Sequence, residues 1–171
     1  NCFLPDDVRI MDASVVDEDF SARRNATSRV YRYFINTGKP FASQMRYVWP
    51  IYYRPDIEKL NKMAECLHGE IDCSTFAAAG DQSVSMFRYI DDAHFFYEGE
   101  NLVFQIEANA FLWKMVRSIT GSLIYFERMG KDAEFFKEVL ESKERKNAGP
   151  TAPAKGLFLH EIKFDGIRRH I

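Results

Sequence analysis

The residues of this sequence that could do chemistry gather between positions 21 and 55, where positive charge is combined with aromatic rings. This segment contains no Asp or Glu, and its seven basic residues are Arg23, Arg24, Arg29, Arg32, Lys39, Arg46 and Arg54. Guanidinium groups pair with phosphates, and aromatic faces accept unstacked bases for about 1–3 kcal/mol each. The segment therefore indicates a nucleic-acid surface. A β-hairpin with its rings in the core and its arginines in solvent would have the same composition.

The composition of the whole chain limits the classes of protein to which it can belong. Its 171 residues predict about one domain, and a hydrophobic content of 46% is enough for a packed core. The formal charge is −2, so the chain outside the basic segment is acidic. No window approaches about 18 uninterrupted apolar residues, and no basic-then-apolar leader opens the chain. We therefore expect neither a membrane partner nor a secretory signal.

The cysteines and histidines do not form a metal-binding or disulfide pattern. The three cysteines, Cys2, Cys66 and Cys73, lack CxxC spacing, and the four histidines form neither HxxxH nor HExxH. We expect no metal and no disulfide framework, and a reducing compartment such as the cytoplasm. Glycine-rich phosphate loops are also absent from the sequence.

The elements that must position the basic segment follow from hydrophobic periodicity. Between residues 27 and 36, Arg29 and Tyr31 share one face of a predicted strand, whereas Arg32 lies on the other. In chain order, the predicted elements are a strand over 27–36, a helix over 55–67, strands over 84–97 and 101–108, helices over 111–129 and 133–142, and a strand over 157–164. Hairpin-linked strands with intervening helices predict an α+β fold, an antiparallel sheet with helices packed on one face.

Six strings of residues, in this order and at this spacing, together resemble the tRNA pseudouridine synthase A family. They are Leu4-Pro5-Asp6-Asp7-Val8, Phe20-Ser21-Ala22-Arg23-Arg24, Arg29-Val30-Tyr31-Arg32-Tyr33, Leu67-His68-Gly69-Glu70-Ile71-Asp72-Cys73-Ser74-Thr75-Phe76, Asn109-Ala110-Phe111-Leu112-Trp113-Lys114-Met115-Val116-Arg117-Ser118-Ile119 and Ala148-Gly149-Pro150-Thr151-Ala152-Pro153-Ala154-Lys155-Gly156-Leu157-Phe158-Leu159. The resemblance implies a pseudouridine synthase-like fold and an RNA isomerase that converts uridine to pseudouridine in the tRNA anticodon stem-loop. It also implies a homodimer that uses neither a cofactor nor a catalytic metal.

The nucleophile of that family is an aspartate in a Gly-Arg-Thr/Ser-Asp motif, and these 171 residues do not contain the motif. We therefore expect the chain to be the C-terminal two thirds, roughly, of such a synthase. In this interpretation residues 1–26 are the end of the N-terminal domain or a linker, and residues 27–171 form the C-terminal catalytic-cleft domain. The fragment alone should be inactive and bind RNA weakly.

The resemblance also suggests roles for individual residues. Tyr31 matches the active-site tyrosine, which stacks on the target uracil, and Arg117 matches the arginine that pairs with the nucleophilic aspartate. Arg23, Arg24, Arg29 and Arg32 are candidates for phosphate contacts, with Arg32 directed away from Tyr31. Asn109 and Phe111 could form the wall of the cleft, although Asn109 would equally suit the N-cap of the long helix.

Two other functions fit the same residues. The chain could be a non-catalytic RNA-binding module on this scaffold, or a dimerisation domain whose aromatic residues between positions 41 and 53 form the interface. RNA binding should weaken steeply with added salt, whereas an apolar interface should not.

Overall fold

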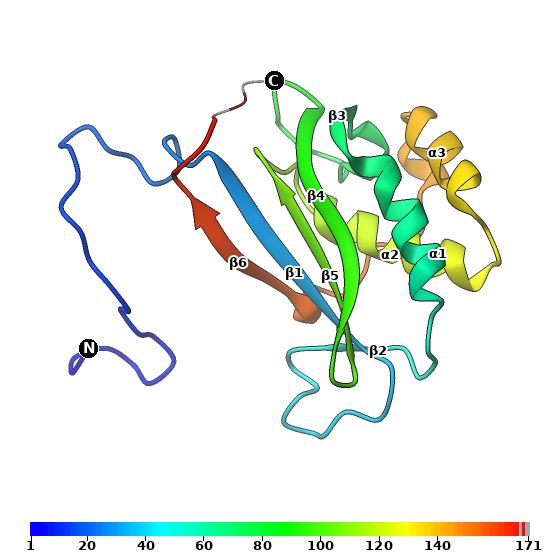
Figure 1. The fold of residues 1–171 in the computed structure, drawn as a ribbon, viewed down its shortest axis with the longest axis horizontal. Helices are drawn as coiled ribbons and strands as arrows, with labels where there is room; N and C mark the ends of the chain where they lie inside the picture. Colours follow the sequence, from blue (N-terminus) through cyan, green and yellow to red (C-terminus); the bar gives the residue numbers. More distant parts are fainter. Residues whose placement is uncertain (168, 170–171) are drawn as a thin grey trace.

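The computed structural model describes residues 1–167 and 169 and has an antiparallel sheet with helices on one face, as predicted (Figure 1). The sheet strands are β1 (Ser28–Asn36), β2 (Trp49–Pro50), β3 (Gly69–Asp72), β4 (Phe87–Glu98), β5 (Asn101–Ala108) and β6 (Leu157–Lys163). The α-helices are α1 (Ile57–Ala64), α2 (Met115–Arg128) and α3 (Ala133–Glu141). Residues 1–26 form no helix or strand and run outside the sheet.

Strand β1 lies at the centre of the pairing. The sheet order is β2-β1-β5-β4-β3, with β6 also paired to β1. Because residues 29–33 pair with both β5 and β6, these two strands lie on opposite sides of β1. All pairs are antiparallel except β1 with β2, where Ile35 lies opposite Trp49. Among the described residues, β6 pairs with β1 alone and forms an edge of the sheet.

The core lies between the sheet and the helices. From β1, Tyr33 and Ile35 are fully buried, and from α2 Ile119 and Leu123 are fully buried as well. Burial of such side chains contributes about 1.5–3 kcal/mol each. The period of two in β1 and the spacing of three to four in α2 therefore place their apolar faces against each other.

The start of α2 corrects the sequence prediction. The helix begins at Met115, not at residue 111, and its N-cap is Lys114, whose φ of 59° is left-handed. The backbone of Trp113 is instead bound to another loop: its carbonyl accepts from the N–H of Ala78, and its N–H donates to the Asp81 carboxylate. Asn109 is therefore not the N-cap of this helix.

Two further features refine the prediction. The short strands β2 and β3 were not predicted from the sequence. The pairing of β4 with β5 also shifts register between Ile90 and Asp92, within the predicted strand over 84–97. No helix in the described part of the chain has the length and apolar character needed to cross a membrane.

Candidate functional site

A cavity of about 420 Å³ lies beside Tyr31 on β1, and we call it the Tyr31 cavity. Its lining residues are Ala22, Arg23, Arg29, Tyr31, Ala110, Phe111, Leu159 and Ile162. They come from the segment before β1, from β1 itself, from the segment leading to α2, and from β6. The strand pairing explains part of this assembly, because Tyr31 lies directly opposite Leu159.

The ring of Tyr31 is held against Phe111. The ring centroids are 5.0 Å apart and the planes meet at 82°, an edge-to-face contact. Such pairs contribute about 0.5–1.5 kcal/mol beyond burial. Phe111 therefore fixes the orientation of a half-buried phenol at the wall of the cavity.

Arg29 organises the backbone around the Tyr31 cavity. Its guanidinium donates to the carbonyls of Arg23 at 2.6 Å, Ala26 at 3.3 Å and Asn109 at 2.7 Å. These contacts tie the segment before β1 to the end of β5. Arg29 thus lines the cavity on the same face as Tyr31, as alternation predicted, and its guanidinium binds backbone carbonyls.

The other predicted arginines lie in different places. Arg23 is exposed and lines the Tyr31 cavity, whereas Arg24 is exposed and is not among the lining residues. Arg32 is on the opposite face of the sheet, as expected, where it donates to Gln105 at 2.8 Å and to Glu98 at 3.4 Å. Only Arg23 and Arg29 of these four reach the cavity.

Asn109 joins three segments next to the cavity without lining it. Its Oδ1 accepts from the N–H groups of Tyr89 and Ala110, and its Nδ2 donates to the carbonyl of Arg169 at 3.1 Å. Its own carbonyl receives the Arg29 guanidinium. Asn109 therefore positions the Ala110–Phe111 wall.

Arg117 lies in the first turn of α2, on the side of the sheet that carries Tyr31. Its Nε donates to the carbonyl of Ala152 at 2.8 Å. Its charge also acts on Tyr33, the next residue after Tyr31 on that face of β1: burial raises the pKa of Tyr33 well above its ordinary value, and Arg117 opposes this increase. Arg117 is not among the residues that line the Tyr31 cavity.

The contribution of β6 to the site was not predicted from the sequence. Leu159 is 48% exposed and Ile162 is 39% exposed, yet both line the Tyr31 cavity. Exposed apolar residues in an edge strand were the available signal. No group of three His, Cys, Asp or Glu side chains within residues 1–167 and 169 is arranged to hold a metal ion.

The sheet and its cavity define an α+β scaffold, and comparison with known proteins identifies its family. Residues 63–165 match the family described as tRNA pseudouridine synthase. A tRNA pseudouridine synthase A of Treponema denticola is 54% identical over 96% of this chain and 62% of that relative. Relatives of the same name from Treponema pallidum and Borrelia turicatae are 44% and 37% identical, over 88% and 96% of this chain.

The chain belongs to the tRNA pseudouridine synthase family, a family of RNA isomerases, and the resemblance found in its sequence is confirmed. It spans 62% and 54% of the two Treponema relatives and 68% of the Borrelia relative.

Proposed function

We propose that the protein to which this chain belongs is a tRNA pseudouridine synthase that isomerises uridine in the anticodon stem-loop. One observation carries the proposal: in a chain of this family, the Tyr31 cavity places an oriented aromatic ring beside the exposed Arg23. A ring and a cation at one cavity suit an extruded base and its phosphate.

The reaction breaks the bond between N1 of uracil and C1′ of the ribose and forms a bond from C5 to C1′. C5 loses a proton and N1 gains one, so the product is an isomer of the substrate. Extracting the uridine from its stack costs a few kcal/mol, which stacking on Tyr31 offsets. We assign Tyr31 to stacking, because Phe111 orients its ring at the wall of the cavity.

Arg117 is proposed to pair with the attacking carboxylate. No Gly-Arg-Thr/Ser-Asp string occurs in the 171 residues, so this carboxylate would come from a part of the protein outside the chain. An opposite charge within about 4–6 Å lowers a carboxyl pKa by about 1–3 units. Arg117 would thereby keep the nucleophile ionised.

The remaining expectations belong to the same proposal. Residues 1–26 would connect to the region that carries the carboxylate, and residues 27–171 would form the cleft domain. Arg24 and Arg29 would add positive charge near the RNA, and Asn109 would hold the cleft wall. The complete protein would be a cytoplasmic homodimer, and the 171-residue chain alone would be inactive.

The test compares the chain with a chimera that adds the part of the Treponema denticola relative that the match leaves out. Each protein is incubated with a tRNA anticodon stem-loop, and pseudouridine is measured by mass spectrometry after chemical derivatisation. We expect product from the chimera and none from the chain alone. Pseudouridine formed by the chain alone would contradict the proposed missing nucleophile. A chimera that binds the RNA without converting it would favour a non-catalytic binding module.

A further inference from the structure

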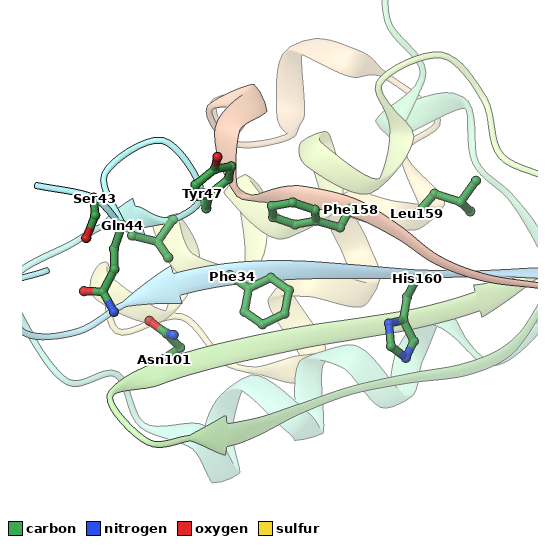
Figure 2. Close-up of a pocket in the computed structure, with 9 residues that line it drawn as sticks. Phe34, Ser43, Gln44, Tyr47, Asn101, Phe158, Leu159 and His160 are labelled. Atoms are coloured by element: carbon green, nitrogen blue, oxygen red, sulfur yellow. The ribbon is translucent and has the colours of Figure 1, made fainter. Parts of the chain in front are cut away.

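A second cavity lies across β6 from Tyr31, and Figure 2 shows the side chains that surround it. It has a volume of about 540 Å³, and we call it the Phe158 cavity. Its lining residues are Phe34, Ser43, Gln44, Tyr47, Val48, Asn101, Phe158, Leu159 and His160. None of them is Lys, Arg, Asp or Glu, so the interior suits a neutral, planar group better than a phosphate.

We propose that the Phe158 cavity binds an unstacked nucleobase of the RNA substrate, a uracil or guanine, at a subsite separate from the Tyr31 cavity. The inference rests on the proposed function, because it takes RNA to be the ligand. The Phe158 cavity would be a second point of contact with the RNA, on the face of the sheet opposite the helices.

Three aromatic rings provide the stacking surface. Phe158 meets Phe34 edge-to-face, with centroids 5.5 Å apart and planes at 84°, and Tyr47 lies 6.4 Å from Phe158. Phe158 is 38% exposed and Tyr47 is 56% exposed, so both rings remain accessible to a ligand. Aromatic faces bind bases of any sequence, because every base has a π-face.

Polar groups at one end of the cavity favour bases with carbonyl oxygens. Gln44 Oε1 accepts from the N–H of Phe41, and Asn101 Oδ1 accepts from Asn36. The side-chain oxygens of Gln44 and Asn101 are therefore occupied, whereas the side-chain NH2 groups of both residues donate to no described residue. Figure 2 shows Gln44 and Asn101 near each other at this end, with His160 toward the other. Amide donors match O4 or O2 of uracil and O6 of guanine.

Charge beside the cavity suits a phosphate backbone outside it. Lys39 and Arg46, in the connection between β1 and β2, are exposed and make no ion pair within the described chain. The same connection has no acidic residue; across from it, the Glu100 carboxylate lies near Gly38. A base inside with its phosphate toward Lys39 and Arg46 would satisfy both the apolar lining and the positive rim.

The position of the cavity favours RNA over a protein partner. Leu159 lines both the Tyr31 cavity and the Phe158 cavity, so the two adjoin across one side chain of β6. A single strand of RNA that crosses this edge can reach both. Binding of a second copy of the chain would need only an apolar surface. It would not require the unpaired amide donors of Gln44 and Asn101.

The experiment titrates the isotope-labelled chain with short oligouridine or oligoadenosine and follows side-chain amide signals by NMR. We expect oligouridine to shift the Gln44 and Asn101 amide signals more than oligoadenosine does. Phe158→Ala should weaken oligouridine binding about 10-fold. The matched control is Phe164→Ala, since Phe164 is 46% exposed and lies outside both cavities; its affinity should be unchanged.

Each other outcome would overturn the inference in a distinct way. If RNA shifts only signals around Arg23 and Ala110, the proposed function stands and the second subsite fails. If RNA shifts neither region, RNA binding by this chain fails as well. If dilution without RNA shifts the signals of the Phe158 cavity, the surface contacts a second copy of the chain.

Discussion

Arg117 and Ala152 are joined by two hydrogen bonds of opposite direction. The Nε of Arg117 donates to the carbonyl of Ala152 at 2.8 Å, and the N–H of Ala152 donates to the carbonyl of Arg117 at 3.0 Å. The guanidinium is thus anchored through Nε, and no described residue accepts from its two terminal nitrogens. Those nitrogens present the planar fork that carboxylates bind. The Pro-rich segment before β6 therefore positions Arg117 as well as connecting two elements.

This connection requires a glycine in α2. A Cβ on Gly121 would lie 1.9 Å from the carbonyl oxygen of Pro150 and 2.8 Å from the nitrogen of Ala152. Gly121→Ala should therefore lower the free energy of unfolding by about 1–3 kcal/mol, even though alanine favours helix by about 1 kcal/mol. Urea unfolding followed by circular dichroism measures this change.

Gly38→Ala is the matched control for that substitution. Its Cβ would meet only the flexible Glu100 carboxylate, at 3.3 Å. We expect a change within about 0.5 kcal/mol. A Gly121→Ala protein as stable as the original would show that the Pro-rich segment does not pack on α2 in solution.

Arg117 can be tested in the chimera described above. Arg117→Ala should reduce kcat about 100-fold or more, because removal of a fixed charge from a site typically costs that much. Without the guanidinium the carboxyl pKa should rise by about 1–3 units, so the acidic limb of the kcat/KM profile should move to higher pH. Arg117→Lys keeps the charge and should leave that limb close to its original position. An Arg117→Ala chimera with unchanged turnover would remove Arg117 from the mechanism.

Local patterns predicted most of the fold. The alternation in β1 correctly separated Arg29 and Tyr31 from Arg32, and Gly99 lies in the predicted β4–β5 hairpin turn. The start of α2 could not be predicted in this way, because the apolar spacing of Phe111 and Leu112 continues the helical pattern. The helix begins only at Met115, because the backbone of Trp113 is bound by Asp81, a residue distant in sequence.

The candidate site was predictable where neighbours in one strand share a face. Tyr31 and Arg29 line one cavity for that reason. The sequence did not reveal that the Arg29 guanidinium binds the carbonyl of Asn109, or that Leu159 would complete the wall, since both contacts join residues that are far apart in the chain. The short strands β2 and β3 were missed because they are defined by their pairing with other strands. Strand β2, for example, has only two residues and pairs with β1.

Tyr31 offers a test of stacking against hydroxyl chemistry. Tyr31→Phe keeps the ring and its contact with Phe111, so binding of an anticodon stem-loop should stay within about 2-fold, whereas Tyr31→Ala should weaken binding about 10-fold. Fluorescence anisotropy of a labelled stem-loop measures both affinities. Equal losses in the two variants would mean that the hydroxyl, rather than the ring, contacts the RNA.

Cys73 provides a prediction about alkaline stability. Its side chain is fully buried, and burial raises the pKa of the thiol from 9.0 to about 12; nearby Arg88 opposes this increase. Between these two values the unfolded chain loses the thiol proton and the folded chain keeps it. The free energy of unfolding should therefore fall as pH rises, by about 1.4 kcal/mol per pH unit for this one proton. Well below pH 9.0 both states keep the thiol proton, so the thiol should contribute no slope there.

The measurement compares slopes rather than absolute stabilities, because Cys73→Ala also leaves a small void in the core. Urea unfolding at several values between about pH 8 and about pH 11 should give a shallower decline for Cys73→Ala than for the original chain. Burial also raises the pKa of Tyr33 and Tyr53, and their contribution is common to both proteins. Cys2→Ala is the control for the loss of an exposed cysteine. Identical slopes for all three proteins would mean that the Cys73 thiol titrates alike in the folded and unfolded chains, against its complete burial in the folded chain.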